Sequence, residues 1–416
     1  MSLCAEILAV GTEILLGDIV NTDARDVSLA LKDLGIDVKW HTVVGDNPDR
    51  LREAVETARR RAGLLVTTGG LGPTYDDLTK ETLADCFGLK LELHPDEAEK
   101  IKQHFRDTGR EMTENNLRQA YLPAGATALY NHNGTAPGCA FFAEGVHVVM
   151  LPGPPRELRR MLETGAVPYL RRLSEGALVC HDIRVFGLGE SAVEALLHER
   201  MTELHNPSLA PYAVEGEVRL RVSAKAADAA AAEALAGPVV SEVCHLLGDL
   251  VYGVDQPSLE AVCLRLLRER GLTLAAAESC TGGLIAKRLT DLPGASQVFR
   301  GGVVSYTNDV KMGLLGVSPA TLDRYGAVSR ETALEMADGV RRVTGAEVAV
   351  SVTGAAGPDS DERGTPVGTG FVGLSTPDRT LCRPIQMGHD RAWGRNLAAS
   401  HAFDLVRRYL TGTLSE

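Results

Sequence analysis

Two short glycine-containing loops, about two hundred residues apart, constrain the fold of this chain more than any other feature. The first is TTGGLGPTYDDLT (residues 67–79) and the second is ESCTGG (residues 278–283). Each loop follows an apolar, strand-like run and precedes a helix-like run, so each lies at the carboxyl end of a predicted buried strand. Ligands bind at that edge in open α/β sheets. The sequence therefore predicts two α/β domains, each with an active site of its own.

The order of strand-like and helix-like runs predicts three domains, because 416 residues are too many for one core. In residues 1–170 the two kinds of run alternate, which predicts a doubly wound α/β domain with a parallel sheet and helices on both faces. Residues 171–254 predict a small α+β domain, with a linker at residues 253–257. The α/β pattern resumes in residues 257–416, where we expect a three-layer α/β domain.

Composition narrows the functional classes. Charged residues make up 24% and apolar residues 44%, which is ordinary for a globular protein, and no run is apolar for the length of a transmembrane helix. The first residues lack the basic and apolar regions of a signal peptide. Eight cysteines without CxxC pairs indicate reduced thiols. We therefore expect a cytoplasmic protein without a membrane segment, and the net charge of −12 disfavours nonspecific nucleic-acid binding.

The first loop has the composition of an anion site. Gly69, Gly70 and Gly72 allow positive φ and close approach of a ligand, and the following helix start supplies N–H groups. Asp76 and Asp77 would repel a phosphate unless a divalent metal (Mg, Mn or Co) bridged them to it. The alternative is that the glycines form a tight turn and the aspartates cap the helix.

Other polar segments of the first domain add candidates for substrate binding. They follow the first strand, or lie in two polar stretches near residues 115 and 133. The full set of predicted substrate-binding residues in this domain is Gly11, Thr12, Glu13, Gly69, Gly70, Gly72, Pro73, Thr74, Asn115, Asn133 and Gly134.

The second loop presents a candidate nucleophile. Ser279 lies between a strand and a glycine-rich helix start, where the N–H groups of Thr281, Gly282 and Gly283 would form an oxyanion hole. No histidine lies nearby in sequence, and Lys311 after the next strand is the candidate base. The alternative is that Ser279 and Thr281 cap a helix and that Lys311 is a solvated surface residue. Cys280, the rival nucleophile, is interpreted as a small buried residue.

Several sequence strings resemble the CinA family over the whole chain. In the first domain these are VGTE (residues 10–13), GGLGPTYDD (69–77) and PGPP (152–155). In the third domain they are AESCTGG (277–283), YTN with the following lysine (306–311) and TGAAGP (353–358). The acidic stretch DSDER (359–363) departs from the family, whose members often continue with more glycines.

The resemblance implies two hydrolase activities. The third domain would deamidate nicotinamide mononucleotide, releasing ammonia, with Ser279, Tyr306 and Lys311 as catalytic residues and no metal. The residues that would bind the substrate there are Thr281, Gly282, Gly283, Asn308, Thr353, Gly354, Arg391 and Arg395. One of the two arginines would hold the nucleotide phosphate, and the sequence does not choose between them.

The first domain would resemble molybdopterin-biosynthesis proteins and hydrolyse ADP-ribose with a divalent metal held by Asp76 and Asp77. The middle domain would be KH-like. It lacks a clear GXXG clamp for nucleic acid, since its nearest glycine loop, at residues 187–191, contains Glu190. We expect a homodimer with nucleotide substrates, a middle domain that acts as a spacer or dimerisation element, and no nucleic-acid partner. The alternatives are a molybdopterin-binding enzyme and an adaptor protein associated with competence or DNA damage.

Overall fold

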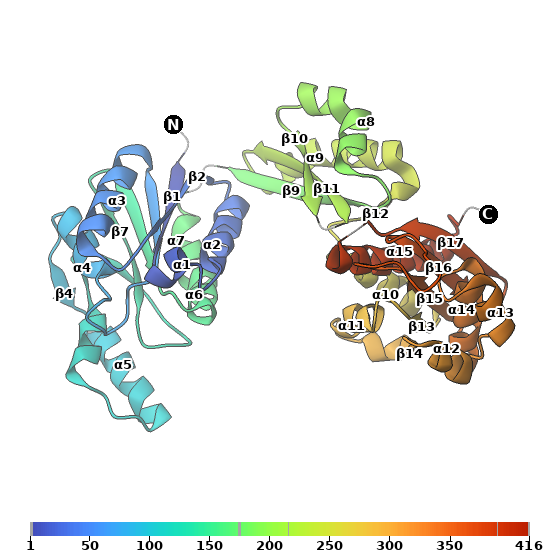
Figure 1. Cartoon of the computed structure of the whole chain (residues 1–416). Coiled ribbons are helices and arrows are strands. Elements are labelled where there is room, and N and C mark those ends of the chain that lie inside the picture. Colours follow the sequence, from blue (N-terminus) through green and yellow to red (C-terminus); the bar gives the residue numbers. More distant parts are fainter. Residues whose placement is uncertain (1–2, 174–175, 215, 389, 415–416) are drawn as a thin grey trace. The chain divides into compact units, whose positions relative to one another are not determined.

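The computed structural model describes residues 3–173, 176–214, 216–388 and 390–414. The chain forms two compact units: Met1–Val179 with Ala224–Ala234, and Cys180–Ser223 with Leu235–Glu416. Figure 1 labels their helices and strands.

A six-stranded sheet in the order β2-β1-β3-β8-β7-β6 forms the centre of the first unit. Its strands are β1 (Cys4–Val10), β2 (Asp37–Val44), β3 (Leu64–Thr68), β6 (Thr127–Leu129), β7 (Gly138–Ala143) and β8 (Val146–Leu151). The strands from β2 to β8 are parallel, whereas β7 and β6 form an antiparallel edge. The order reverses between β1 and β3, so the ligand crevice of a doubly wound sheet is expected where these two strands end.

Helices cover both faces of this sheet (Figure 1), as the sequence predicts. One face is covered by α3 (Pro48–Arg61) and α4 (Thr79–Cys86), and the other by α2 (Thr22–Asp33), α6 (Pro155–Met161) and α7 (Val167–Leu170). The remaining elements are α1 (Thr12–Leu16), β4 (Leu91–Leu93), α5 (Pro95–Thr108), a 3-10 helix (Glu114–Ala120), β5 (Tyr121–Pro123) and a π-helical turn (Leu162–Ala166).

Local sequence explains where these helices begin. The side chain of Asn47 accepts a hydrogen bond from the N–H of Arg50, and Pro48 occupies the first turn of α3, where its missing N–H costs nothing. Asn21 caps α2 in the same way, through the N–H of Ala24.

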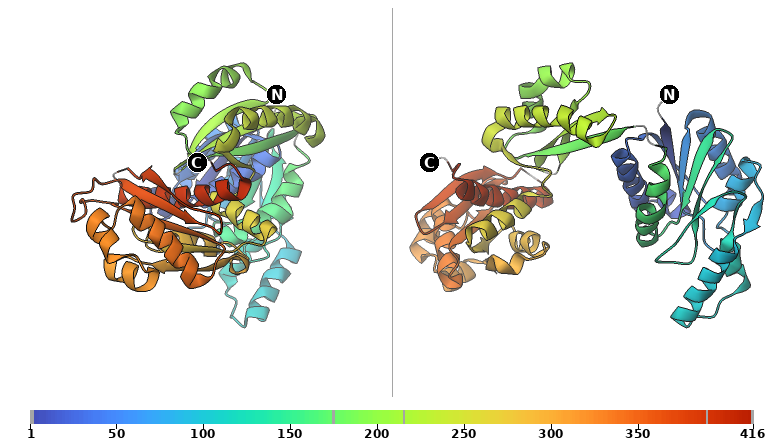
Figure 2. Two further views of the ribbon diagram at one scale, coloured as in Figure 1. Left: turned by 90° about the vertical axis from the view of Figure 1, so that its right-hand side faces the viewer. Right: turned by 180° about the vertical axis from the view of Figure 1, so that it is seen from behind.

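The middle domain contains a four-stranded sheet in the order β10-β11-β9-β12 and two helices. Figure 2 shows both helices on the same side of this sheet. The elements are β9 (Ala177–Val185), α8 (Glu190–Glu203), β10 (Ser208–Val214), β11 (Glu217–Ala226), α9 (Ala229–Leu247), a 3-10 turn (Gly248–Leu250) and β12 (Val251–Val254). The linker predicted at residues 253–257 overlaps β12, because Gly253 pairs with Arg184 of β9. A four-residue strand is too short to be recognised by its periodicity.

One described helical segment, Ala229–Leu250, is apolar and long enough to cross a membrane by length and composition alone. Small side chains at helical spacing, Ala232, Ala236 and Val243, are buried within the middle domain. The core helix of a soluble protein meets the same criterion, so the segment is weak evidence for a membrane span.

The C-terminal domain has three layers, as predicted. Its five-stranded sheet has the order β14-β13-β15-β16-β17, with β13 parallel to both neighbours. Its strands are β13 (Leu274–Glu278), β14 (Phe299–Val304), β15 (Val348–Gly354), β16 (Thr369–Ser375) and β17 (Thr380–Gln386). One face packs on α10 (Leu259–Arg270), α11 (Leu284–Thr290) and α15 (Arg391–Thr411). The other packs on α12 (Asn308–Leu315), α13 (Pro319–Tyr325) and α14 (Arg330–Thr344). A 3-10 turn spans Ala295–Gln297.

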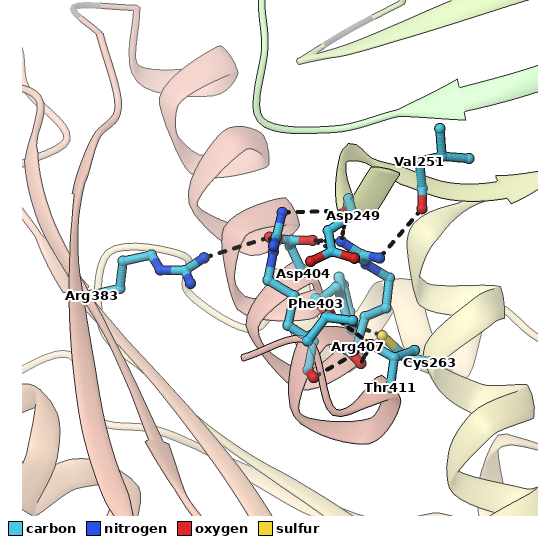
Figure 3. A network of polar contacts seen from close by, with 10 residues as sticks. Asp249, Val251, Cys263, Arg383, Phe403, Asp404, Arg407 and Thr411 are labelled. Carbon is cyan, nitrogen blue, oxygen red and sulfur yellow. Dashed lines mark hydrogen bonds and ion pairs between the residues drawn. The ribbon is translucent and has the colours of Figure 1, made fainter. Parts of the chain in front are cut away.

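A buried ionic network joins α15 to the end of the middle domain (Figure 3). Asp404 is 3% exposed and accepts hydrogen bonds from Arg407 and Arg408. Arg407 also donates to the backbone oxygen of Asp249 at 2.8 Å, and to that of Val251 at 3.5 Å. Because a buried guanidinium must remain paired, this network fixes α15 relative to β12.

Candidate active sites

Ser279 begins the loop that follows β13, at the point where the order of the C-terminal sheet reverses. Its N–H donates to the backbone oxygen of Val352 at 2.9 Å, and the N–H of Ser305 donates to that of Glu278 at 2.8 Å. These bonds extend the sheet on both sides of β13 and fix the start of the loop. Ser279 therefore lies at the position where a sheet of this kind is expected to bind its ligand.

Lys311 lies against Ser279. Its Nζ is 3.1 Å from the Ser279 Oγ and donates to the backbone oxygen of Ser305 at 2.8 Å. The residue is only 1% exposed, and burial lowers the pKa of its ammonium group to about 8. The alternative interpretation of Lys311 as a solvated surface residue is therefore wrong, because α12 turns its side chain into the domain.

Tyr306 follows β14 and is 58% exposed. Its hydroxyl accepts a hydrogen bond from Arg391 at 3.0 Å. The same guanidinium donates to the backbone oxygen of Gly357 at 2.6 Å. Arg391 thus orients Tyr306 toward the loop that follows β15.

Arg395, one helical turn further along α15, holds a different part of the site. Its guanidinium donates to the backbone oxygens of Cys280 at 3.0 Å and Thr281 at 2.7 Å. Arg391 is exposed and Arg395 is half-buried. Arg395 therefore fixes the backbone of the Ser279 loop, and Arg391 remains the more accessible cation.

The predicted oxyanion hole needs a correction. The buried carboxylate of Glu278 accepts the N–H groups at the start of α11 at 2.9–3.0 Å, those of Gly283, Ile285 and Ala286. The N–H of Gly282 donates to the backbone oxygen of Ser279. Two of the three predicted donors, Gly282 and Gly283, are therefore already paired. The N–H of Gly283 is taken up because the Glu278 carboxylate caps the helix that was expected to supply free N–H groups.

Cys280 is buried, and burial raises the pKa of its thiol to about 11. A thiol in this state is a poor nucleophile at neutral pH. All eight cysteines of the chain are free, in agreement with the expectation of reduced thiols.

The other residues predicted to bind substrate in this domain lie around the same crevice. Asn308 is exposed at the first position of α12. The Thr353 hydroxyl donates to the backbone oxygen of Ala327 at 2.7 Å, so it supports the loop after β15. A Cβ at Gly354 would clash with Met387, which explains why a glycine stands there.

The acidic stretch at residues 359–363 is folded on itself. The Asp361 carboxylate accepts the N–H groups of Arg363 and Thr365. The Arg363 guanidinium donates to backbone oxygens at the end of α13, including that of Leu322 at 3.0 Å. These contacts hold the stretch against the end of α13 and leave its net charge unchanged, so the repulsion of a phosphate that its composition suggests stays a prediction.

A cavity of about 560 Å³ in the first unit lies where β1 and β3 end. Gly69 and Gly70 have φ of 91° and 67°, as expected for a loop that turns tightly under a ligand. A Cβ at Gly69 would meet the backbone oxygen of Val10, so the two strand ends are in close contact. The predicted residues that line the cavity are Gly11, Glu13, Gly69, Gly70, Gly72, Pro73, Thr74, Asp76 and Asp77.

Other predicted residues of this domain lie outside the cavity lining. Thr12 bonds to Asp46 through its N–H and its hydroxyl. Asn115 accepts from Thr113 within the 3-10 helix, and the Asn133 amide donates to the backbone oxygen of Arg156. Gly134 lines a smaller adjoining hollow. Polar side chains in loops often form hydrogen bonds to nearby protein groups. The sequence alone does not show which of them do so and which face a ligand.

Gln119 is a polar residue of this cavity that is not among those predicted from the sequence to bind substrate. It lines the cavity and is 1% exposed, and its Oε1 has no hydrogen-bond partner. The buried Lys80 ammonium donates to the backbone oxygens of Arg118 and Gln119 at 3.0 and 2.9 Å and so fixes this segment. Asn115, the residue of the same polar run that the sequence predicts to bind substrate, lies outside the cavity lining.

The cavity is lined by five acidic residues and by no lysine or arginine. The Asp77 carboxylate accepts the N–H of Thr74 at 2.9 Å, whereas the Asp76 carboxylate has no hydrogen-bond partner among the described residues. Among the residues that the structure describes, no group of three His, Cys, Asp or Glu side chains is close enough to hold a metal alone. The donors fit a hard cation that takes one or two carboxylates and completes its shell with phosphate oxygens and water.

Three family models match successive parts of the chain. They describe a probable molybdopterin binding domain (residues 6–172), a damage-inducible protein CinA KH domain (residues 181–253) and a CinA C-terminal domain (residues 256–410). A CinA-like protein of Kosmotoga olearia is 46% identical over 406 residues, which cover 98% of each chain. A putative competence-damage inducible protein of Acetivibrio thermocellus is also 46% identical, with the same coverage.

Solved structures of related proteins cover single domains. A protein CinA of unknown function from Thermoplasma acidophilum is 34% identical and covers 41% of this chain and 98% of its own, with a TM-score of 0.38. A competence damage-inducible protein A from Klebsiella pneumoniae is 32% identical and covers 37% of this chain and 95% of its own, with a TM-score of 0.36.

Proposed function

The chain belongs to the CinA family, and on that premise we propose that its C-terminal domain is an amidohydrolase. The substrate is nicotinamide mononucleotide, and the products are nicotinate mononucleotide and ammonia. The observation that carries the proposal is the distance of 3.1 Å between the Nζ of the buried Lys311 and the Ser279 Oγ. A desolvated lysine beside a serine is the arrangement of a nucleophile and its base.

The chemistry follows from these two side chains. Neutral Lys311 takes the proton of the Ser279 hydroxyl while Oγ bonds to the carboxamide carbon. The carbon–nitrogen bond then breaks, and the leaving amine takes a proton and departs as ammonia. Water hydrolyses the resulting ester, which restores the serine. Tyr306, oriented by Arg391, is placed to relay or orient a proton, and Arg391 is the accessible cation for the substrate phosphate.

Ammonia release from nicotinamide mononucleotide by the purified full-length chain tests this proposal. Wild type should turn over, and Ser279→Ala should lose activity by about three orders of magnitude or more. Cys280→Ala is the matched control at the adjacent position. Full activity of Ser279→Ala would overturn the Ser-Lys mechanism, and no ammonia release by wild type would overturn the substrate assignment.

A second activity is proposed for the first domain, where the acidic cavity at the ends of β1 and β3 favours it. The glycine loop supplies backbone N–H groups for one phosphate of ADP-ribose, and Asp76 and Asp77 would hold a divalent metal of the Mg, Mn or Co type. The metal, when bound, would neutralise these carboxylates and polarise a phosphate oxygen. Phosphate release from ADP-ribose products, coupled through a phosphatase, should require added metal. Hydrolysis at full rate in excess chelator would overturn the assignment.

The alternatives predict different results. A molybdopterin-binding enzyme would leave the Ser279–Lys311 pair without a role and release no ammonia. An adaptor protein for nucleic acid would give a gel shift at moderate salt, where the proposed enzyme should give none. The molar mass of the purified chain in solution, measured by light scattering, tests the proposed homodimer.

A further inference from the structure

A cavity of about 410 Å³ lies between the middle domain and α15. Three residues of α15 at four-residue spacing line it, Trp393, Leu397 and His401. Arg391 and Arg395, offset by two positions, contact the Ser279 loop and Tyr306 instead. Residues two apart on a helix point about 200° apart, so opposite faces of α15 serve the two sites. The cavity is therefore separate from the Ser279 site.

The walls of this cavity are apolar and aromatic. Trp393 is 38% exposed, and the buried ring of Phe186 meets the His401 ring edge-on, with 5.0 Å between centroids. Leu188 and Val214 of the middle domain line it as well. A volume of this size holds a drug-sized or nucleoside-sized ligand. Apolar walls with a partly exposed indole suit a flat ring better than a strongly hydrated ion.

The charged residues that line this cavity disfavour the binding of an anion. Glu190 and Glu217 line the cavity, and no lysine or arginine does so among the described residues. Burial lowers the pKa of the His401 imidazole, which keeps it neutral at neutral pH. Burial raises the pKa of Glu217, whereas the hydrogen bond from the Tyr252 hydroxyl and the charges of Arg288 and Arg184, all outside the lining, act in the opposite direction. A phosphorylated ligand would therefore meet carboxylates without a compensating cation in the wall.

We propose that this cavity binds a small flat heteroaromatic cation of the N-substituted pyridinium class, without a phosphate. The ring packs on Trp393, where the face of the indole attracts a cation, and Glu190 and Glu217 offset its charge. The loop at residues 187–189, the nearest approach in the sequence to a nucleic-acid clamp, forms part of this wall. The proposal stands independently of the amidase activity.

Tryptophan fluorescence tests the proposal directly, because the chain has two tryptophans. Trp40→Phe leaves Trp393 as the single tryptophan of the full-length protein, and excitation at about 295 nm selects it over the tyrosines. Titration with 1-methylnicotinamide should quench it saturably, with a dissociation constant of about 0.1–1 mM. Nicotinate, the same ring as an anion, and tetramethylammonium, the charge without a ring, should each bind at least about tenfold more weakly. Linear, non-saturable quenching, or equal binding of nicotinate, would overturn the proposal.

Two variants locate the ligand. In the Trp40→Phe background, Val214→Phe fills the cavity from an exposed position at the end of β10 and should weaken binding at least about tenfold. Glu190→Gln should reduce the preference for 1-methylnicotinamide over neutral nicotinamide. Arg391→Ala alters the Ser279 site and should leave binding unchanged. Loss of binding in Arg391→Ala with retention in Val214→Phe would place the ligand at the Ser279 site and sink the proposal.

Discussion

Arg391 and Arg395 lie one turn apart on α15, yet they hold different parts of the C-terminal site. Arg391 bonds to the Tyr306 hydroxyl, and Arg395 bonds to the backbone oxygens of Cys280 and Thr281. The first contact orients an exposed side chain, and the second shapes the loop that carries the nucleophile. This division makes the two arginines distinguishable by kinetics, although the sequence treats them as equivalent.

Arg391→Ala should raise KM for nicotinamide mononucleotide more than it lowers kcat, because it removes the accessible cation for the phosphate. Arg395→Ala should mainly lower kcat, because the Ser279 loop loses two backbone contacts. Each effect is expected to be about tenfold to a hundredfold. Steady-state kinetics of both variants measure the split, and a larger KM effect in Arg395→Ala would reverse the assignment.

Lys311→Ala should be about as damaging as Ser279→Ala, and the double variant little worse than either. Residues that act as one unit show strongly non-additive losses. Single-turnover ammonia release by the two single variants and the double variant measures this coupling. Multiplicative losses would show that Ser279 and Lys311 do not act together. Circular dichroism of all three variants controls for folding.

The pH profile of the amidase should rise as the pH increases through about 8. Burial lowers the pKa of Lys311 to about 8, and only the neutral amine accepts the Ser279 proton. The rise is measured as kcat/KM between pH 6 and 9.5. It should be unchanged in Cys280→Ala, because burial raises the pKa of the wild-type Cys280 thiol to about 11 and keeps it protonated over most of this range. A flat profile would mean that another group is the base.

Glu278→Gln should destabilise the C-terminal domain by about 1–3 kcal/mol, because the buried carboxylate accepts three N–H groups of α11 and an amide cannot replace all three bonds. Thermal unfolding measures the loss. Amidase activity should fall as well, since the cap shapes the loop between Ser279 and Gly283. Glu269→Gln, at an exposed position on α10, is the control and should leave the melting temperature unchanged. An unaltered melting temperature in Glu278→Gln would contradict the capping role.

Asp76→Asn should weaken the metal dependence of ADP-ribose hydrolysis without loss of stability, since the Asp76 carboxylate bonds to none of the described residues. Asp77→Asn should affect both, because Asp77 also holds the N–H of Thr74. Metal titrations of the initial rate and melting curves measured side by side separate the two effects. Unchanged metal response in both variants would leave the aspartates with a capping role only.

The local elements could be predicted from the sequence, because burial periodicity, caps and glycines act over a few residues. The strands ending near Thr68 and Glu278 and the cap of α3 at Asn47 are such features. The short strands β10 and β12 could not be predicted, since hydrogen bonds from distant strands stabilise them. The residues that line the sites are equally hard to predict, because they depend on tertiary packing. Gln119 lines the first cavity, whereas Asn115 of the same polar run does not.

The sequence by itself determined that Ser279 follows a buried strand and precedes a helix, since a strand, loop and helix are adjacent in the chain. Only the tertiary structure decided which groups meet there. Lys311 reaches Ser279 across 32 residues, and Arg391 reaches Tyr306 across 85. The physical reason is that such contacts depend on the order of strands in the sheet and on the packing of helices across it, which place residues together whatever their separation along the chain.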